Sequence, residues 1–481
     1  MIFTEARFLW FYLAVFAVTW ATRNHTLRKV WLLAASYTFY GAWDKRFLAL
    51  IVFSTVVDFI AGRALAGERP AAQRKRWLLL SLTTNLGLLG VFKYYDFFVT
   101  EGAALLTWMG LPSDPTLLAV ILPAGISFYT FQTLSYTIDV YRRNLQATDK
   151  PLDFALFVGF FPQLVAGPIV RATDFLPQLR TPRRFADVAV RAQLTLFMVG
   201  FIKKAVVSDS VAPIVEQVFA HPEAYGLGAK WLGALLYTVQ IYCDFSGYSD
   251  MAIGCAGLLG YELTLNFDYP YLARSITSFW RRWHISLSSW FRDYLFIPLG
   301  GSRGTPMKTW RNLLIVFLLC GLWHGARWTF IVWGLYHGMF LVLERLASAR
   351  QLRPAPRALT HLYTLLVTVL GWVLFRSGDL ASAGRYLRGM VTGTAEASLA
   401  HDGPWLPDAT APLAGSVPHA QWWWAGLALF AVVHLAMARR TFAEPLTRLP
   451  DWAFAVAYGL AVALIAPWIA TDFQPFIYFQ F

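Results

Sequence analysis

The sequence predicts an all-α polytopic membrane protein with about 12 transmembrane helices, accompanied by re-entrant or interfacial helices. Of its 481 residues, 57% are hydrophobic, 17% are aromatic and only 14% are charged, and soluble domains do not have such a composition. The mean hydropathy of +0.47 agrees with this class. The sequence contains no internal repeat, low-complexity tract or soluble domain, so residues 1–481 are expected to form one integral membrane domain.

Apolar runs that could cross a hydrocarbon core of roughly 30 Å recur from one end of the chain to the other. The first run carries Glu5 and Arg7 and lacks a small-residue cleavage site, so we expect a retained helix. The predicted crossings are residues 3–22, 30–43, 47–62, 77–99, 118–140, 192–208, 231–259, 311–326, 327–345, 358–376, 422–438 and 451–471.

Basic residues concentrate in alternate loops, which the positive-inside rule places in the cytoplasm. These loops are Arg23–Lys29, Arg63–Arg76, Arg142–Arg191, Arg274–Arg311, Arg345–Arg357 and Arg439–Arg448. The longer intervening loops contain acids and no Lys or Arg, and they should face the periplasm: 100–117, 209–229 and 391–421. Exceptions to this pattern are Lys45, Arg46, Arg327, Arg376, Arg385 and Arg388. With twelve crossings, this pattern predicts that both termini lie outside, on the periplasmic or exterior side. The protein's net charge of +13 suits anionic lipids better than nucleic acid.

Two apolar stretches are too short or too broken to be simple crossings. Pro151–Arg171 is interrupted by Pro162, Gly167 and Pro168, and Ser278–Gly301 contains several charges. Such backbone is tolerated at membrane depth only where protein or a water-filled cavity satisfies its polar groups. We therefore expect re-entrant or interfacial helices in both places.

The stretch Trp280–Gly301 packs charged residues between tryptophans. A continuous helix would bring Arg282, Trp283, Trp290 and Asp293 to one side. Two interpretations stay open. The element could hold the phosphates and adenine ring of a nucleotide-bearing donor, or it could be an interfacial helix whose arginines meet lipid phosphates. The candidate donor-binding residues are Arg281, Arg282, Trp283, Arg292 and Trp323.

The apolar run Gln240–Gly254 is interrupted by Asp244, Ser246 and Asp250. Buried aspartates in a membrane need partners, such as Arg281 and Arg282. A structural ion pair is favoured over a catalytic acid, so we assign these three residues a supporting role.

The strongest single candidate is His324, in the stretch Gly321–Gly338. One interpretation is a packed histidine that caps a helix. The other is a neutral imidazole in a dry niche beside Trp323 and Gly325, able to take a proton from an attacking hydroxyl. His337 is expected to be structural.

Several common catalytic patterns are absent from the sequence. It has no GxSxG elbow, no GxxxxGK phosphate loop and no HxxxxD pair at either His284 or His324. The three cysteines lack metal-ligand spacing, so neither zinc nor a disulfide is expected. These absences argue against serine-hydrolase and ATP-driven chemistry but leave open a proton-coupled transporter or polysaccharide exporter, because broken helices and buried charges also describe one.

Motifs along nearly the whole chain resemble the membrane-bound O-acyltransferase family, and within it the branch of bacterial alginate O-acetyltransferase membrane subunits. The stretches that carry the resemblance are WRRWH with His284, GLWHGA with His324, SYTFYGAWD at 36–44, ILPAGISFYTFQTLSYTIDVYR at 121–142, PQLVAGPIVR at 162–171, KKAVVSDSVAPIV at 203–215, CDFSGYSDMAIG at 243–254 and the closing PFIYFQF.

This resemblance implies a helical fold with a central tunnel, open to acetyl-CoA from the cytoplasm and to the acceptor from outside. His324 stands at the position of the family's catalytic histidine, and His284 at a second polar position that is asparagine in some members. The resemblance further implies a periplasmic acetyltransferase partner of the SGNH or serine-hydrolase type, which esterifies an exported polysaccharide such as alginate. Acetyl-CoA would be a substrate, with no bound cofactor. Related branches acetylate cellulose or peptidoglycan or load D-alanine onto teichoic acid.

Overall fold

The computed structural model describes residues 1–351, 355–392, 420–438, 448–470 and 476. Within them the chain is helical, and its extended pairing is limited to one parallel bridge between Glu5 and Ala470. This confirms the predicted all-α class. Helices long and apolar enough to span a membrane are Lys45–Ala66, Trp328–Ala349, Arg357–Arg376, Gln421–Ala438 and Asp451–Trp468. The total of twelve crossings stays a prediction.

The first part of the chain forms helices that are capped where the sequence supplies short polar side chains. The Leu27 N–H donates to Asn24 Oδ1 (3.0 Å) and the Arg46 N–H to Asp44 Oδ1 (2.9 Å), and each bond satisfies an amide that a helix start leaves unpaired. The elements are α1 (Ala6–Ala21), α2 (His25–Gly41), α3 (Lys45–Ala66), α4 (Ala71–Leu89), the π-helical turn η1 (Gly90–Tyr94), α5 (Tyr95–Trp108), α6 (Ile126–Tyr141), α7 (Pro151–Gly159), α8 (Phe161–Leu164), α9 (Ala172–Arg180) and η2 (Phe185–Asp187).

The second part contains both the longest helix and the most broken segment. Its elements are α10 (Val190–Phe201), the π-helical turn η3 (Ile202–Ser208), α11 (Asp209–Ala220), η4 (Pro222–Ala224), α12 (Leu227–Leu258), η5 (Pro270–Leu272), α13 (Ile276–Trp280), α14 (Ile285–Phe291), the π-helical turn η6 (Arg292–Phe296), α15 (Pro306–His324), α16 (Trp328–Ala349), α17 (Arg357–Arg376), α18 (Leu380–Thr392), α19 (Ala420–Ala438), α21 (Asp451–Ile465) and η7 (Ala466–Trp468).

Every predicted crossing overlaps a helix, but the boundaries of 118–140 were wrong. Residues 111–123 form no helix, and α6 begins only at Ile126. Prolines at 112, 115 and 123 remove backbone donors and disfavour the helical conformation of the residues before them. The Asp96 carboxylate accepts from the N–H groups of Leu118 (2.8 Å) and Ala119 (3.0 Å) and holds this segment against α5.

Two other crossings are parts of longer helical runs. Residues 77–99 lie inside α4–η1–α5, and 192–208 lie inside α10–η3–α11. In both runs a π-helical turn continues the helix instead of ending it. The first half of the expected outer loop 209–229 is therefore helix. Most of the loop predicted at 391–421 lies outside the described residues.

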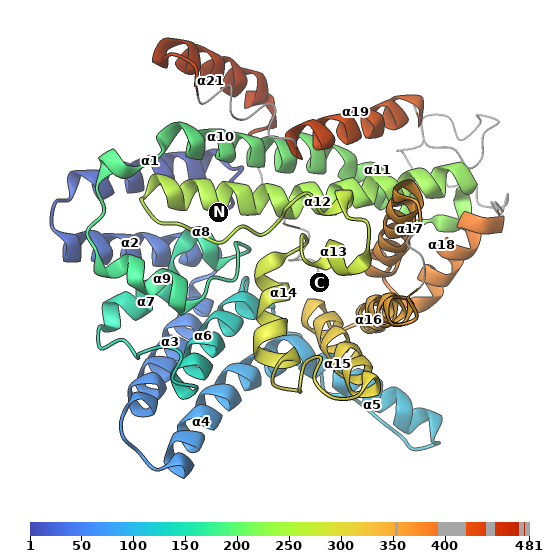
Figure 1. Cartoon of the computed structure of the whole chain (residues 1–481), viewed down its shortest axis with the longest axis horizontal. Coiled ribbons are helices and arrows are strands. Elements are labelled where there is room, and N and C mark those ends of the chain that lie inside the picture. The colour runs from blue at the N-terminus through green and yellow to red at the C-terminus, as the bar shows by residue number, and fades with distance from the viewer. Residues whose placement is uncertain (352–354, 393–419, 439–447, 471–475, 477–481) are drawn as a thin grey trace.

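Helix α12 is the centre of the packing. It contacts α10, α11, α17, α18 and α19, and in Figure 1 it runs beside α10 across the upper half of the molecule. Most of its residues are buried, as expected for a helix that is apolar on all sides. The hairpin α15–α16 and the short helices α13 and α14 lie together below it in Figure 1.

The two stretches that fit no simple crossing do form short, interrupted helices. They are α7–α8 and α13–α14–η6, and each is largely buried by protein. Their backbone groups find protein partners: the Gln163 amide donates to Phe157 O (2.6 Å), and the Ile169 N–H donates to Ser286 Oγ (3.0 Å). The second bond joins the two stretches. Their burial and internal hydrogen bonding match the condition that membrane depth imposes.

Candidate active site

His324 ends helix α15 at the tip of the α15–α16 hairpin. Thr305 caps the start of this helix by accepting from the Lys308 N–H (3.4 Å), and Pro306 occupies its first turn. Near the tip, Gly321 and Gly334 let the two helices touch, because a Cβ on either residue would collide with a backbone carbonyl oxygen of the other helix. The close crossing fixes the backbone that carries His324.

The His324 side chain lies in an aromatic niche and is 3% exposed. Its ring meets those of Trp323 (4.9 Å between centroids, 82°), Trp333 (5.0 Å, 90°) and Phe375 (5.3 Å, 75°) in edge-to-face geometry. These surroundings exclude bulk water, so the dry niche predicted from the sequence is confirmed.

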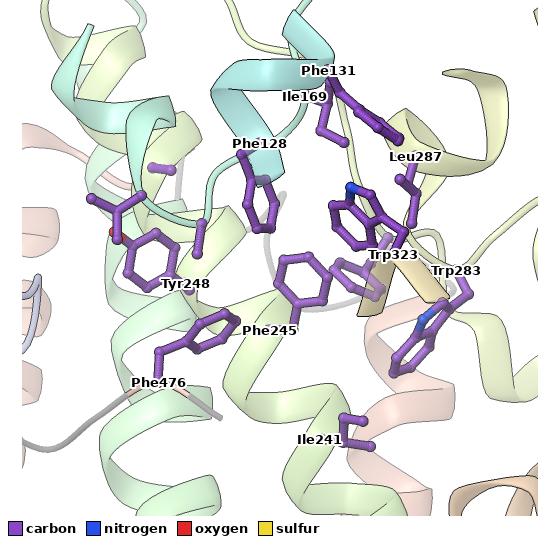
Figure 2. Packing of buried hydrophobic residues seen from close by; sticks show 14 of the residues in the cluster. Phe128, Phe131, Ile169, Ile241, Phe245, Tyr248, Trp283, Leu287, Trp323 and Phe476 are labelled. Atoms are coloured by element: carbon purple, nitrogen blue, oxygen red, sulfur yellow. The ribbon is translucent and has the colours of Figure 1, made fainter. Parts of the chain in front are cut away.

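His284 lies at the break between α13 and α14, with a left-handed backbone (φ 44°). It is fully buried, and its ring meets Phe245 edge-on (4.6 Å, 80°) and lies 5.9 Å from the ring of Trp323. The rings of both histidines therefore pack near Trp323, at 5.9 Å for His284 and 4.9 Å for His324. Within the described residues, neither His284 ring nitrogen has a hydrogen-bond partner. Figure 2 shows the Phe245 and Trp323 rings that line this interior.

A cavity of about 160 Å³ reaches His324. Its wall is mostly apolar, and Lys93, Ser127 and His324 are its polar side chains. The other lining residues are Trp43, Ile121, Leu122, Pro123, Ala124, Gly125, Ile126, Phe128 and Trp323. It lies against the α2–α3 turn and the segment before α6, near regions that the charge pattern predicts to be periplasmic.

The continuous helix expected over Trp280–Gly301 is wrong, because residues 281–284 interrupt it. Arg282 pairs with Asp268 (3.3 Å) instead of approaching Asp293. Asp293 pairs with Arg171 and with Arg292, each at 2.6 Å. The predicted helix face that would have brought Arg282 and Asp293 together therefore does not form.

The candidate donor-binding residues differ in accessibility. Arg281 and Arg292 are exposed, whereas Trp283 is buried and stacks on Phe279 (5.5 Å, 18°). Trp283 packs the core beside His284 and presents no open face to an adenine ring. Trp323, the fifth candidate, lines the cavity, and its ring lies 5.9 Å from that of His284 and 4.9 Å from that of His324.

The buried aspartates of α12 pair with lysines that sequence reasoning missed. Asp244 lies 2.7 Å from Lys204, and Asp250 lies 2.7 Å from Lys203. The expected partners Arg281 and Arg282 were wrong, because η3 packs directly against α12. The sequence did contain a signal for these partners, because Lys203 and Lys204 lie inside the apolar run predicted to cross at 192–208. Ser246 is fully buried, and its hydroxyl has no hydrogen-bond partner among the described residues.

His337 is fully buried between the rings of Trp280 (5.1 Å) and Trp333 (5.2 Å). It is not among the residues that line the cavity. Where side chains are described, no group of three or more His, Cys, Asp or Glu could hold a metal ion, and the three cysteines are buried thiols.

The described part of this apolar chain is helical, and it has a buried histidine, His324, on the wall of an internal cavity. These features define a polytopic membrane protein with an internal polar site. Sequence comparison specifies the family. The model of MBOAT, the membrane-bound O-acyltransferase family, matches residues 141–378. A protein of Azotobacter vinelandii named "Probable alginate O-acetylase" is 39% identical over 521 residues, covering 100% of each chain. The chain belongs to the membrane-bound O-acyltransferase family.

Other relatives differ in the acceptor that their names give. The "Peptidoglycan O-acetyltransferase" of Helicobacter pylori is 38% identical, over 81% of this chain and 78% of its own. The "Teichoic acid D-alanyltransferase" of Bacillus subtilis is 31% identical, over 45% of this chain and 57% of its own. The chain is therefore an acyltransferase and a multi-pass membrane protein, and the transporter alternative gives way to an enzyme.

Proposed function

We propose that this acyltransferase takes acetyl groups from acetyl-CoA on the cytoplasmic side of a bacterial inner membrane and passes them across it for the O-acetylation of an exported polysaccharide. The observation that carries the proposal is the placement of His324 on the wall of a cavity, with the His284 ring packed near the same Trp323 side chain. The full-length similarity to a protein named as an alginate O-acetylase supports alginate as the polymer.

In the proposed reaction, His324 acts as a base or proton relay. Its imidazole accepts the proton of an acceptor hydroxyl as the hydroxyl oxygen attacks the thioester carbonyl. The new C–O bond forms, the C–S bond breaks, and the sulfur of coenzyme A leaves with the proton that the imidazole returns. His284 orients or polarises the thioester carbonyl. A positioned base of this kind contributes about 10²- to 10⁴-fold to a rate.

The donor would approach from the side of Arg281 and Arg292, which are exposed, and of Arg282, which is half-buried. Guanidinium groups bind phosphate through charge-assisted hydrogen bonds. The acceptor would enter the cavity from the periplasm, where a partner of the serine-hydrolase type would receive the acetyl group and esterify the polymer. Cellulose, peptidoglycan and the D-alanylation of teichoic acid are the alternative acceptor systems.

The test is acetyl release from labelled acetyl-CoA by the purified protein in detergent, with and without periplasmic proteins and oligomannuronate. We expect consumption of acetyl-CoA that depends on the acceptor side. A stable preparation that neither binds nor consumes acetyl-CoA with its acceptors supplied would refute the proposed donor.

The proposed orientation has its own test. Single cysteines replacing Ala71 and Asp114, both exposed, would be introduced into a cysteine-free background. An impermeant thiol reagent applied to spheroplasts should label position 114 and not position 71, because basic loops stay in the cytoplasm. The reverse pattern would invert the topology and move the donor side.

A further inference from the structure

Lys93 belongs to the turn η1, which lies more than two hundred residues from His324 in the sequence and contacts the end of α15. Its ammonium donates to Trp323 O (2.6 Å) and His324 O (3.1 Å), and it lies 3.4 Å from Ser127 Oγ. A π-helical turn holds one residue more than the regular helix, and such turns are frequent at functional sites. This turn brings the consecutive side chains of Lys93 and Tyr94 to the tip of the α15–α16 hairpin.

Together these side chains satisfy the last carbonyl groups of α15, which a helix end leaves without partners. Gly321 O accepts from the Gly325 N–H (3.4 Å) and Leu322 O from the Tyr94 hydroxyl (2.8 Å). The Lys93 ammonium donates to the remaining two carbonyl groups, Trp323 O and His324 O. The backbone of His324 is thereby fixed from outside its own hairpin.

Lys93 also lines the cavity that His324 lines. Among the described residues it forms no ion pair, since its partners are two carbonyl groups and a hydroxyl. When the amine is protonated, no carboxylate among the described residues therefore pairs with its charge. In a dry, mostly apolar cavity, a fixed charge acts over several ångströms on any negative charge that develops nearby.

We propose that Lys93 is a positioning residue for acyl transfer, which fixes the turn that carries His324 and supplies the positive charge that favours the oxyanion formed in the cavity. The inference rests on the proposed function of His324. It goes further because it assigns a second, distant element, η1, to the reaction site.

The test separates the charge of Lys93 from its capping role with three variants. Lys93→Arg keeps the charge and the donors, Lys93→Gln keeps amide donors without the charge, and Tyr94→Phe removes a cap from the same helix turn. Tyr94 does not line the cavity, so its variant is the matched control. Turnover and the KM for acetyl-CoA would be measured on purified protein, with thermal stability in the same detergent.

We expect Lys93→Gln to lower turnover by about 10²-fold, the size of effect found when preorganised electrostatic stabilisation of an oxyanion is lost. Its KM for acetyl-CoA should stay close to that of the wild type. Lys93→Arg should recover much of the turnover, and Tyr94→Phe, which loses one cap of the same turn and keeps Lys93, should lose much less turnover than Lys93→Gln. Wild-type turnover in Lys93→Gln, or an equal loss in Tyr94→Phe, would overturn the inference.

Failure of the proposed function gives a different result. If His324→Ala retained full acetyl transfer, the assignment of the base would be wrong. Turnover of the Lys93 variants is compared in proteins that keep His324, so this comparison tests Lys93 separately from the role of His324. If Lys93→Gln proves unstable, the comparison of Lys93→Arg with Tyr94→Phe decides: an arginine variant that is folded but as inactive as an empty membrane contradicts the role of the charge.

Discussion

Two regions of this molecule bury charged or ionisable side chains, and they do so in opposite ways. In the paired cluster, Lys203, Lys204, Asp209, Asp244 and Asp250, every lysine meets a carboxylate at 2.7 Å. Around the His324 cavity, Lys93 meets only carbonyl and hydroxyl oxygens, and His284 meets aromatic rings. The paired cluster ties η3 and α11 to α12, whereas Lys93 and His324 lie on the wall of the cavity.

The difference separates structural from chemical use of polarity inside a membrane protein. A paired charge costs a large loss of stability when one partner is removed, because the other stays buried alone. An uncompensated group next to a cavity can act on a substrate, and such residues mark functional sites. Variants in the two regions should therefore fail in different measurements.

The largest effect on activity is expected for His324→Ala. Removing a base costs about 10²- to 10⁴-fold in rate. The variant should still fold, because α15 and α16 cross at Gly321 and Gly334 and not at the His324 ring. Polymer acetylation in cells and acetyl transfer by purified protein would be measured at matched abundance.

His337→Ala is the control for this variant, since it removes an equally buried imidazole that does not line the cavity. It should lower stability and retain much more activity than His324→Ala. Equal activity in the two variants would remove the distinction between the histidines.

In the paired cluster, Asp250→Leu should destabilise the protein by about 3–5 kcal/mol, because Lys203 would stay buried without its carboxylate. Thermal unfolding in detergent and abundance in the membrane report the effect. The double variant Lys203→Met with Asp250→Leu should recover most of the loss. A double variant as unstable as the single one would show that the pair does not act as a unit.

A smaller effect is expected for Arg282→Gln. If Arg282 holds a donor phosphate, the lost charge-assisted contact is worth about 1.5 to 3 kcal/mol, and the acetyl-CoA requirement should rise roughly tenfold or more. Asp268→Asn is the matched control, since it removes the carboxylate charge beside Arg282 and keeps both the guanidinium and its bond to Asp268 O (3.0 Å). If both variants change donor affinity equally, Arg282 serves Asp268 and not the donor.

The smallest effect is expected for Ser246→Ala. The hydroxyl has no hydrogen-bond partner among the described residues, so unfolding stability should change by less than about 1 kcal/mol, the net worth of a typical hydrogen bond. Acetyl transfer should stay within twofold of the wild type. A large loss of transfer in a stable variant would move Ser246 from packing to chemistry.

Local patterns in the sequence predicted the helical class, the two broken stretches and the dry niche of His324. Hydropathy over about 20 residues identifies segments that can span a membrane. Trp323 is the chain neighbour of His324, so its place beside the His324 ring follows from local sequence. Boundaries were less certain where proline or π-helical turns decide whether a helix stops or continues. The segment before α6 and the run through η3 are the two examples.

What only the tertiary structure decided is which distant groups meet. Composition predicted a membrane protein, the residues around His324 made it a candidate, and the family resemblance added His284, because those signals lie within short stretches of chain. The partners of Asp244 and Asp250, the break that separates Arg282 from Asp293, and the approach of Lys93 to His324 across 231 residues depend on how helices pack. Packing is set by side-chain shape and by close crossings at residues such as Gly321 and Gly334, and no local pattern contains that information.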